Sequence, residues 1–225
     1  MSAEPLLIQP LHETRTLAQE GRPLLSYTLS RPHLVGEGAP LRRIDRYYER
    51  LGRRWLERWN GPLYRRACAA EEASLAAARP FQPWSASFTW RITYAGSDAL
   101  SLCWEAEEIR EGVHPVRRMF DVWSLKDGLP LTLDQVLPHG RGWKSVVRKA
   151  LAGQIEAWEQ TEPEQILPHW RSHLRKALRT SRFYLTPEGP VLLVPPGLLR
   201  PVRVGWVSFP LQNETEPGLP ETDRA

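Results

Sequence analysis

The stretch of sequence that decides the fold lies near the C-terminus and reads Phe183-Tyr184-Leu185-Thr186-Pro187-Glu188-Gly189, followed by Pro190-Val191-Leu192-Leu193-Val194-Pro195-Pro196. Apolar and polar residues alternate over 183–186, which predicts a strand, and the triplet 187–189 has the composition of a tight turn. The continuous apolar run at 191–194 is typical of a strand that is buried on both faces. Two prolines then end it, because proline has no N–H to donate to a neighbouring strand. The stretch predicts the centre of a sheet and indicates no chemistry.

This stretch is followed by a loop that contains Pro201 and by a closing strand, Val207-Ser208-Phe209-Pro210. The whole order resembles a bacterial domain of unknown function. That domain is found in the ectodomains of RsiV-type, lysozyme-sensing anti-sigma factors and beside the catalytic domain of PdaC-type peptidoglycan deacetylases. The resemblance covers residues 126–211 well and residues 21–125 in the order of elements only. It implies an RsiV-like fold and a recognition role without catalysis.

The length and composition are those of an ordinary globular protein. A chain of 225 residues, 41% hydrophobic and 25% charged, can bury a core without a disulfide or a metal. We expect one globular domain over residues 1–211 and a disordered acidic tail over residues 212–225. No apolar run approaches the roughly 20 residues of a membrane span, and the N-terminus lacks signal-peptide character. These features predict no transmembrane segment and a cytoplasmic location, whereas the anti-sigma factors that the chain resembles are extracytoplasmic.

Blocks of strand pattern and helix pattern alternate along the chain. They predict strands at 6–9 and 23–30, helices at 41–59 and 63–79, three antiparallel strands within 84–125, helices at 143–160 and 168–180, and the C-terminal strands. Asn60-Gly61-Pro62 predicts the end of the first helix. The expected class is α+β, with an antiparallel sheet built from the three-strand meander and the C-terminal strand set and packed by about four helices. The expected core of the meander is Phe88, Trp90, Leu102 and Trp104.

Two groups of residues resemble catalytic or metal sites. His169 and His173 have the i,i+4 spacing of zinc ligands, but Trp170 stands where a zinc protease has its glutamate. We interpret both as surface histidines. Four carboxylates on adjacent strands invite a glycosidase interpretation, although cross-strand ion pairs with nearby arginines are the simpler one. They are Glu105, Glu107, Glu108 and Asp121. The sequence therefore predicts no enzyme, no metal and no cofactor.

The predicted first helix is rich in arginine. The residues are Arg42, Arg43, Arg46, Arg50, Arg53, Arg54 and Arg58. An arginine face of this kind can contact the phosphates of a nucleic acid. However, Asp45, Glu49 and Glu57 lie three or four residues from arginines, which favours ion pairs within the helix. We therefore predict a solvated helix face and keep a cytoplasmic nucleic-acid-associated protein as the alternative function.

The loop after the diproline is the predicted ligand-binding segment. It comprises Pro195, Pro196, Gly197, Leu198, Leu199, Arg200 and Arg203. Prolines stiffen the loop, which lowers the entropy lost on binding. Related domains carry an aromatic and an acidic residue after the diproline, and the change to Gly197-Leu198 implies a different partner. The main functional prediction is a non-catalytic recognition or sensing domain for a protein or a cell-wall-related ligand such as a peptidoglycan fragment. In the alternative interpretation, both leucines pack under the sheet and the loop is structural.

Overall fold

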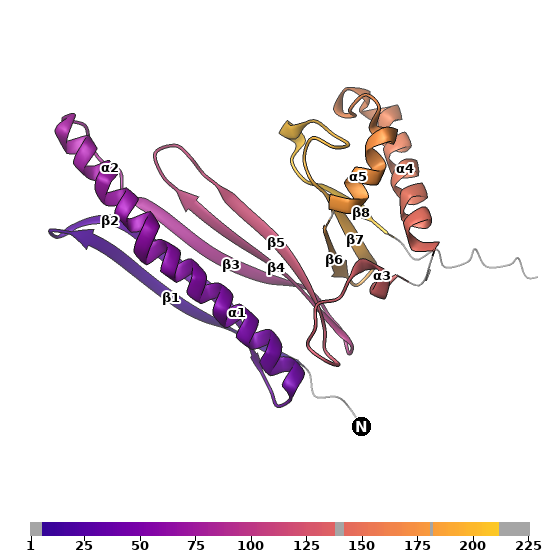
Figure 1. The fold of residues 1–225 in the computed structure, drawn as a ribbon, viewed down its shortest axis with the longest axis horizontal. Coiled ribbons are helices and arrows are strands. Elements are labelled where there is room, and N and C mark those ends of the chain that lie inside the picture. The colour runs from indigo at the N-terminus through magenta and orange to yellow at the C-terminus, as the bar shows by residue number, and fades with distance from the viewer. Residues whose placement is uncertain (1–5, 138–141, 181, 212–225) are drawn as a thin grey trace, which may run out of the picture. The chain divides into compact units, whose positions relative to one another are not determined.

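The structure, a computed structural model, describes residues 6–137, 142–180 and 182–211. The contacts within the chain divide it into two compact units, residues 1–131 and residues 132–225. Each unit combines helices with a sheet (Figure 1), so the predicted α+β class is confirmed. The single domain expected over 1–211 stays a prediction, and the expected tail over 212–225 lies outside the described residues. No helix of the described ranges is both long enough and apolar enough to cross a membrane.

The first unit is built on a five-stranded sheet in the order β1-β2-β3-β4-β5. Its strands are β1 (Leu7–Gln19), β2 (Arg22–Val35), β3 (Trp84–Ala95), β4 (Ala99–Ile109) and β5 (Val116–Ser124). The last three form the antiparallel meander that the alternating pattern predicted. In contrast, β2 and β3 are parallel, so this sheet is mixed. A parallel pair needs a long crossover connection, which the helices between β2 and β3 supply.

The hairpin of β1 and β2 extends well beyond the short strands predicted at 6–9 and 23–30. Its turn consists of Glu20 and Gly21, whose φ values of 51° and 79° are those of a two-residue hairpin turn. Within the hairpin, Pro10 lies opposite Pro32. Prolines are tolerated here because β1 is an edge strand and this part of β2 lies beyond its pairing with β3. Because the prolines interrupt the strand pattern and β1 is largely exposed, the sequence did not predict the full length of either strand.

A single helical segment connects β2 to β3. α1 (Ala39–Arg58) continues through a π-helical turn (Trp59–Leu63) into α2 (Tyr64–Ala76). The predicted helix end at Asn60-Gly61-Pro62 is therefore wrong. A π-turn already departs from the regular hydrogen-bond pattern, so it tolerates a proline that has no N–H. Trp59 anchors this turn, since it is fully buried and its ring centroid lies 5.4 Å from that of Tyr27.

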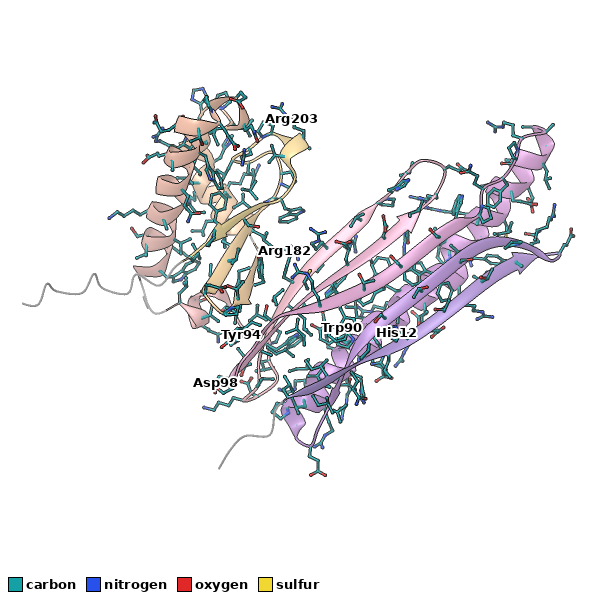
Figure 2. The ribbon with its side chains drawn as sticks, turned by 180° about the vertical axis from the view of Figure 1, so that it is seen from behind. His12, Trp90, Tyr94, Asp98, Arg182 and Arg203 are labelled. Atoms are coloured by element: carbon teal, nitrogen blue, oxygen red, sulfur yellow. The ribbon has the colours of Figure 1, made fainter. Side chains whose placement is uncertain are left out.

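The core of the first unit lies between these helices and the sheet. Phe88, Leu102 and Trp104 are buried in it, as predicted. Trp90 (Figure 2) is only partly buried and packs at the margin of the core. Ile92, which follows on the same face of β3, is 44% exposed. The alternating pattern identifies the inner face of a strand, but it does not show where the covering helices stop.

The second unit contains the stretch that decides the fold. Its elements are α3 (Leu133–Val136), α4 (Trp143–Thr161), α5 (Trp170–Thr180), β6 (Arg182–Thr186), β7 (Gly189–Val194) and β8 (Val207–Pro210), with short 3-10 helices at Pro163–Gln165 and Val202–Val204. The strands form a three-stranded antiparallel sheet with β7 in the middle. The apolar run at 191–194 is buried throughout, as predicted. The C-terminal strands make a sheet of their own, whereas we expected one sheet shared with the meander.

Candidate functional site

α1 carries four exposed arginines spaced four residues apart: Arg42, Arg46, Arg50 and Arg54. We call them the arginine row. Side chains at this spacing share one face of a helix and follow one another about 6 Å apart along its axis. Within the ranges that the structure describes, none of the four guanidinium groups makes a hydrogen bond or an ion pair. The row is therefore a line of uncompensated positive charge.

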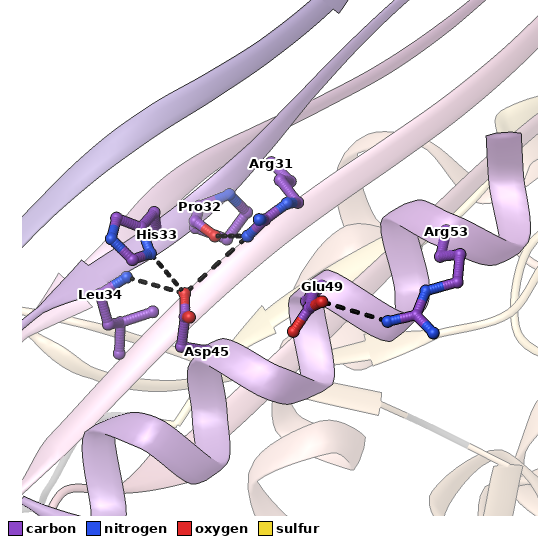
Figure 3. A network of polar contacts seen from close by, with 7 residues as sticks. All are labelled: Arg31, Pro32, His33, Leu34, Asp45, Glu49 and Arg53. Carbon is purple, nitrogen blue, oxygen red and sulfur yellow. Dashed lines mark hydrogen bonds and ion pairs between the residues drawn. The ribbon is translucent and has the colours of Figure 1, made fainter.

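Acidic residues of α1 were expected to neutralise these arginines, and the structure corrects that expectation in part. The Oδ1 atom of Asp45 lies 2.9 Å from Nδ1 of His33 and accepts the backbone N–H of Leu34 at 3.2 Å (Figure 3). Asp45 thus faces β2 and not the arginine one turn before it. Glu49 does pair within the helix, with Arg53 at 3.1 Å, as predicted. The solvated-face interpretation accounts for this pair but not for the arginine row.

A groove of about 750 Å³ runs beside the arginine row. The row and Arg43 line it from α1, which we call its charged side, and Leu129 and Pro130 line it from the loop after β5, which we call its aliphatic side. Tyr47, Leu51 and Trp123 complete most of the lining. Among the described residues that line it, none is acidic. The groove is therefore positively charged on one side and aliphatic on the other.

A hydrogen-bonded network supports the aromatic residues of the groove. The indole N–H of Trp123 donates to the Tyr48 hydroxyl at 3.0 Å, and that hydroxyl donates to Asp121 at 3.1 Å. Asp121 also accepts the indole N–H of Trp104 at 2.9 Å. The ring of Tyr47 packs edge-on against Trp123, with centroids 4.9 Å apart. These contacts connect α1 to β4 and β5, so they hold one side of the groove in place.

Burial and the nearby Asp121 carboxylate raise the pKa of the tyrosines of this network. Burial is the main reason that the pKa of Tyr47 rises to about 12, and the nearby Asp121 carboxylate adds to the effect while Arg54 opposes it. Burial raises the pKa of Tyr48 as well, again reinforced by Asp121. Both hydroxyls therefore stay protonated at neutral pH. Tyr47, which lines the groove, is therefore neutral and adds no charge to it.

Beside the groove, the loop after β5 meets the start of α1 in a tight backbone contact. Gly128 has φ of +71°, and a Cβ atom at this position would lie 2.5 Å from the carbonyl oxygen of Pro40. Beside it, Arg43 donates to the carbonyl oxygen of Asp127 at 2.8 Å. Only glycine permits both the left-handed backbone and the close approach. The loop after β5 is therefore fixed to the N-terminal end of α1.

No protein-family model and no curated protein matches this sequence. Solved structures do match its fold. A member of the DUF3298 family from Bacteroides fragilis is similar with a TM-score of 0.64 and 14% sequence identity, over 92% of this chain and 90% of that one. A DUF3298 family protein from Pseudomonas aeruginosa PAO1 is similar with a TM-score of 0.55 and 14% identity, over 93% and 91%. The predicted likeness to a bacterial domain of unknown function is thus confirmed at the level of the fold.

The predicted ligand-binding loop is largely engaged within the second unit. Leu199 is fully buried, and Leu198 packs partly against the same core. The guanidinium of Arg200 bonds Glu162 at 2.5 Å and also Gln165, and its side chain is 12% exposed. Pro195, Pro196 and Gly197 are half-buried. The structural interpretation of this part of the loop therefore has geometric support.

The distal part of the loop is different. Arg203 is exposed at its tip (Figure 2), next to Val202, which is 74% exposed. Trp206 is also exposed. Of the residues predicted to bind a ligand, Arg203 is the one that the structure leaves exposed.

Most of the other candidate groups have structural partners. Glu105 pairs with Arg118 across the strands at 2.5 Å, as predicted. Glu108 is buried and receives two hydrogen bonds from Arg58 of α1. The imidazole Nδ1 of His173 lies 3.0 Å from the carbonyl oxygen of Leu198. Within the described part of the chain, no group of three or more His, Cys, Asp or Glu residues is arranged to hold a metal ion.

The sequence identified the arginines that line the groove, but it did not predict the groove itself. The spacing of 42, 46, 50 and 54 was visible, and it marks one helix face. The opposite side, Leu129 and Pro130, comes from a turn some 75 residues later in the sequence. Its one local signal is the turn dipeptide Asp127-Gly128, which by itself predicts only the end of the preceding strand.

Proposed function

We propose that this chain is a non-catalytic recognition domain that binds an acidic ligand along the arginine row. The observation that carries the proposal is the row itself: four exposed, unpaired guanidinium groups beside a groove without acidic lining. Like charges one helical turn apart repel each other, by about 0.2–0.5 kcal/mol per pair. The row therefore lowers the stability of the chain alone, and an acidic ligand would remove that cost.

The chemistry of arginine supports this role. A guanidinium presents several N–H donors in a planar fork that matches a carboxylate or a phosphate, and it stays charged at every physiological pH. Arginines beside apolar surface are also less screened than arginines surrounded by water. The groove provides this setting through Leu51, Leu129 and Trp123.

A recognition role also agrees with the rest of the molecule. Asp121, Glu105 and Glu108 are each engaged by neighbouring side chains, which is typical of structural carboxylates. The resemblance of residues 126–211 to RsiV-type sensing domains supports binding rather than catalysis. The exposed tip of the loop in the second unit, Val202 and Arg203, is a second candidate contact surface for the same function.

The test measures binding of two simple polyanions, polyglutamate and single-stranded oligothymidylate, by fluorescence anisotropy at increasing salt. The proposal predicts binding that weakens as salt rises, because the contacts are ionic. Arg46→Ala/Arg50→Ala should weaken it about tenfold, equivalent to about 1.4 kcal/mol. The matched control is Arg65→Ala/Arg66→Ala, which removes the same charge from exposed positions of α2. Equal losses in the two variants, or no binding of either polyanion at low salt, would refute the proposed function.

A further inference from the structure

The two sides of the groove differ in chemistry, and this difference restricts the ligand. The arginine row forms the charged side. Leu129, which is 48% exposed, and the exposed Pro130 form the other. A ligand that is acidic throughout would leave this aliphatic side in contact with water. A ligand with apolar groups opposite its acidic groups would cover both sides.

We propose that the groove binds an extended segment of a partner protein in which acidic residues alternate with apolar residues, an inference that rests on the proposed function. In an extended chain successive side chains point to opposite faces, and those on one face follow each other about 6.6–6.8 Å apart. The arginine row repeats about every 6 Å. Alternate acidic side chains can therefore each meet one guanidinium, while the intervening apolar side chains face Leu129 and Pro130.

The length of the row sets the length of the segment. From Arg42 to Arg54 the helix rises about 18 Å. An extended segment of about seven residues spans about 20 Å between its first and last residues. Four acidic and three apolar residues in alternation would thus occupy the full row.

The aromatic residues of the groove argue against a nucleic acid as the occupant. Proteins that hold single strands stack bases on exposed aromatic faces. Here Trp123 is only 5% exposed, and its indole N–H is already bonded to Tyr48. Tyr47 is 36% exposed, but its ring packs edge-on against both Trp123 and Tyr48. Leu129 and Pro130, on the aliphatic side of the groove, suit leucine or valine side chains better than bases.

The groove is also built to bind without rearrangement. The Gly128–Pro40 contact and the Arg43–Asp127 hydrogen bond fix its two sides to each other at one end. Such preorganisation reduces the entropy lost on binding, so a short segment suffices.

The experiment compares two labelled seven-residue peptides of the same composition by anisotropy with the full chain. In one, four glutamates alternate with three leucines. In the other, the four glutamates precede the three leucines. We expect the alternating peptide to bind about tenfold more tightly, equivalent to about 1.4 kcal/mol. Both Arg46→Ala/Arg50→Ala and Leu129→Ser should weaken it, whereas Arg65→Ala/Arg66→Ala should leave it within about twofold. Leu129 is exposed, so its variant is expected to fold, which circular dichroism checks.

Equal affinity for the two peptides would overturn this inference, and so would a Leu129→Ser variant that binds like the original chain. Tighter binding of an oligothymidylate of similar charge would overturn it in favour of a nucleic acid. In each of these cases loss of binding in Arg46→Ala/Arg50→Ala would leave the proposed function standing. Failure of polyglutamate, both peptides and oligothymidylate to bind would refute the proposed function as well.

Discussion

Replacement of Gly128 by alanine tests the structural basis of the groove. An alanine Cβ would lie 2.5 Å from the carbonyl oxygen of Pro40 and 2.8 Å from its Cα atom. These are backbone atoms at the start of α1, so they cannot rotate away as a side chain can. The loop after β5 must therefore move away from α1. That movement should break the hydrogen bond from Arg43 to Asp127 and open the groove.

The loss in the free energy of unfolding caused by Gly128→Ala has two parts. Gly128 has φ of +71°, and the left-handed conformation costs a residue with a Cβ about 1–2 kcal/mol. Forcing an extra carbon into an occupied position typically costs a further 1–3 kcal/mol. We therefore expect Gly128→Ala to lower the free energy of unfolding by about 2–5 kcal/mol. Urea denaturation followed by tryptophan fluorescence would measure it.

Gly112 provides a matched control in the same unit. Its φ is +75°, nearly that of Gly128, but a Cβ there would meet no atom within 4 Å. Gly112→Ala should therefore cost only the conformational part, about 1–2 kcal/mol. The difference between the two variants isolates the contact with Pro40. Equal destabilisation would show that Gly128 does not hold the loop against α1, and the account of the groove would be wrong.

Three further predictions concern single side chains. Because the pKa of Tyr47 is about 12 in the folded chain and 10.0 when unperturbed, the unfolded chain loses this proton first as pH rises. The free energy of unfolding should thus fall as pH rises from 10 to 12, and the Tyr47 proton should not affect it near neutral pH. Tyr47→Phe should remove part of that fall when urea denaturation is repeated across this pH range. A fall of the same size in Tyr47→Phe would contradict the prediction. Arg200→Ala should lower the free energy of unfolding by about 1.5–3 kcal/mol because its largely buried guanidinium makes charged hydrogen bonds, whereas Arg203→Ala should change it by no more than about 0.5 kcal/mol. Similar values for the two variants in urea denaturation would refute this contrast. Arg58→Ala should lower the free energy of unfolding by about 1–3 kcal/mol, because it leaves the buried Glu108 without its two hydrogen-bond donors. A change near zero would contradict this prediction.

The fold could be predicted from the sequence where the pattern is local. The alternation at 183–186, the turn at 187–189 and the apolar run at 191–194 identified β6 and β7, and the same reasoning identified the meander. The sequence failed where context overrides a local signal. Pro62 ordinarily stops a helix, but here the π-turn and the burial of Trp59 carry the helix through it.

The candidate site could be predicted only in part. The arginines of α1 stand out in the sequence, but whether they are paired depends on where the acidic residues point. Asp45 points to β2, and that follows from the packing of α1 on the sheet. In the same way, Arg200 was predicted as a polar anchor for a ligand, yet it bonds Glu162 from the end of α4. Contacts between elements that are distant in the sequence decide these roles.

The most direct measurement of the central claim follows the arginine side chains themselves. Nitrogen-15 NMR of the guanidinium groups, recorded while the alternating glutamate–leucine peptide is added, reports each arginine separately. We predict that the signals of Arg42, Arg46, Arg50 and Arg54 shift together and saturate, while the signal of Arg58, which is held by Glu108, stays in place. A row that responds neither to this peptide nor to polyglutamate, or a uniform small change across all arginines, would contradict an acidic-ligand site on α1.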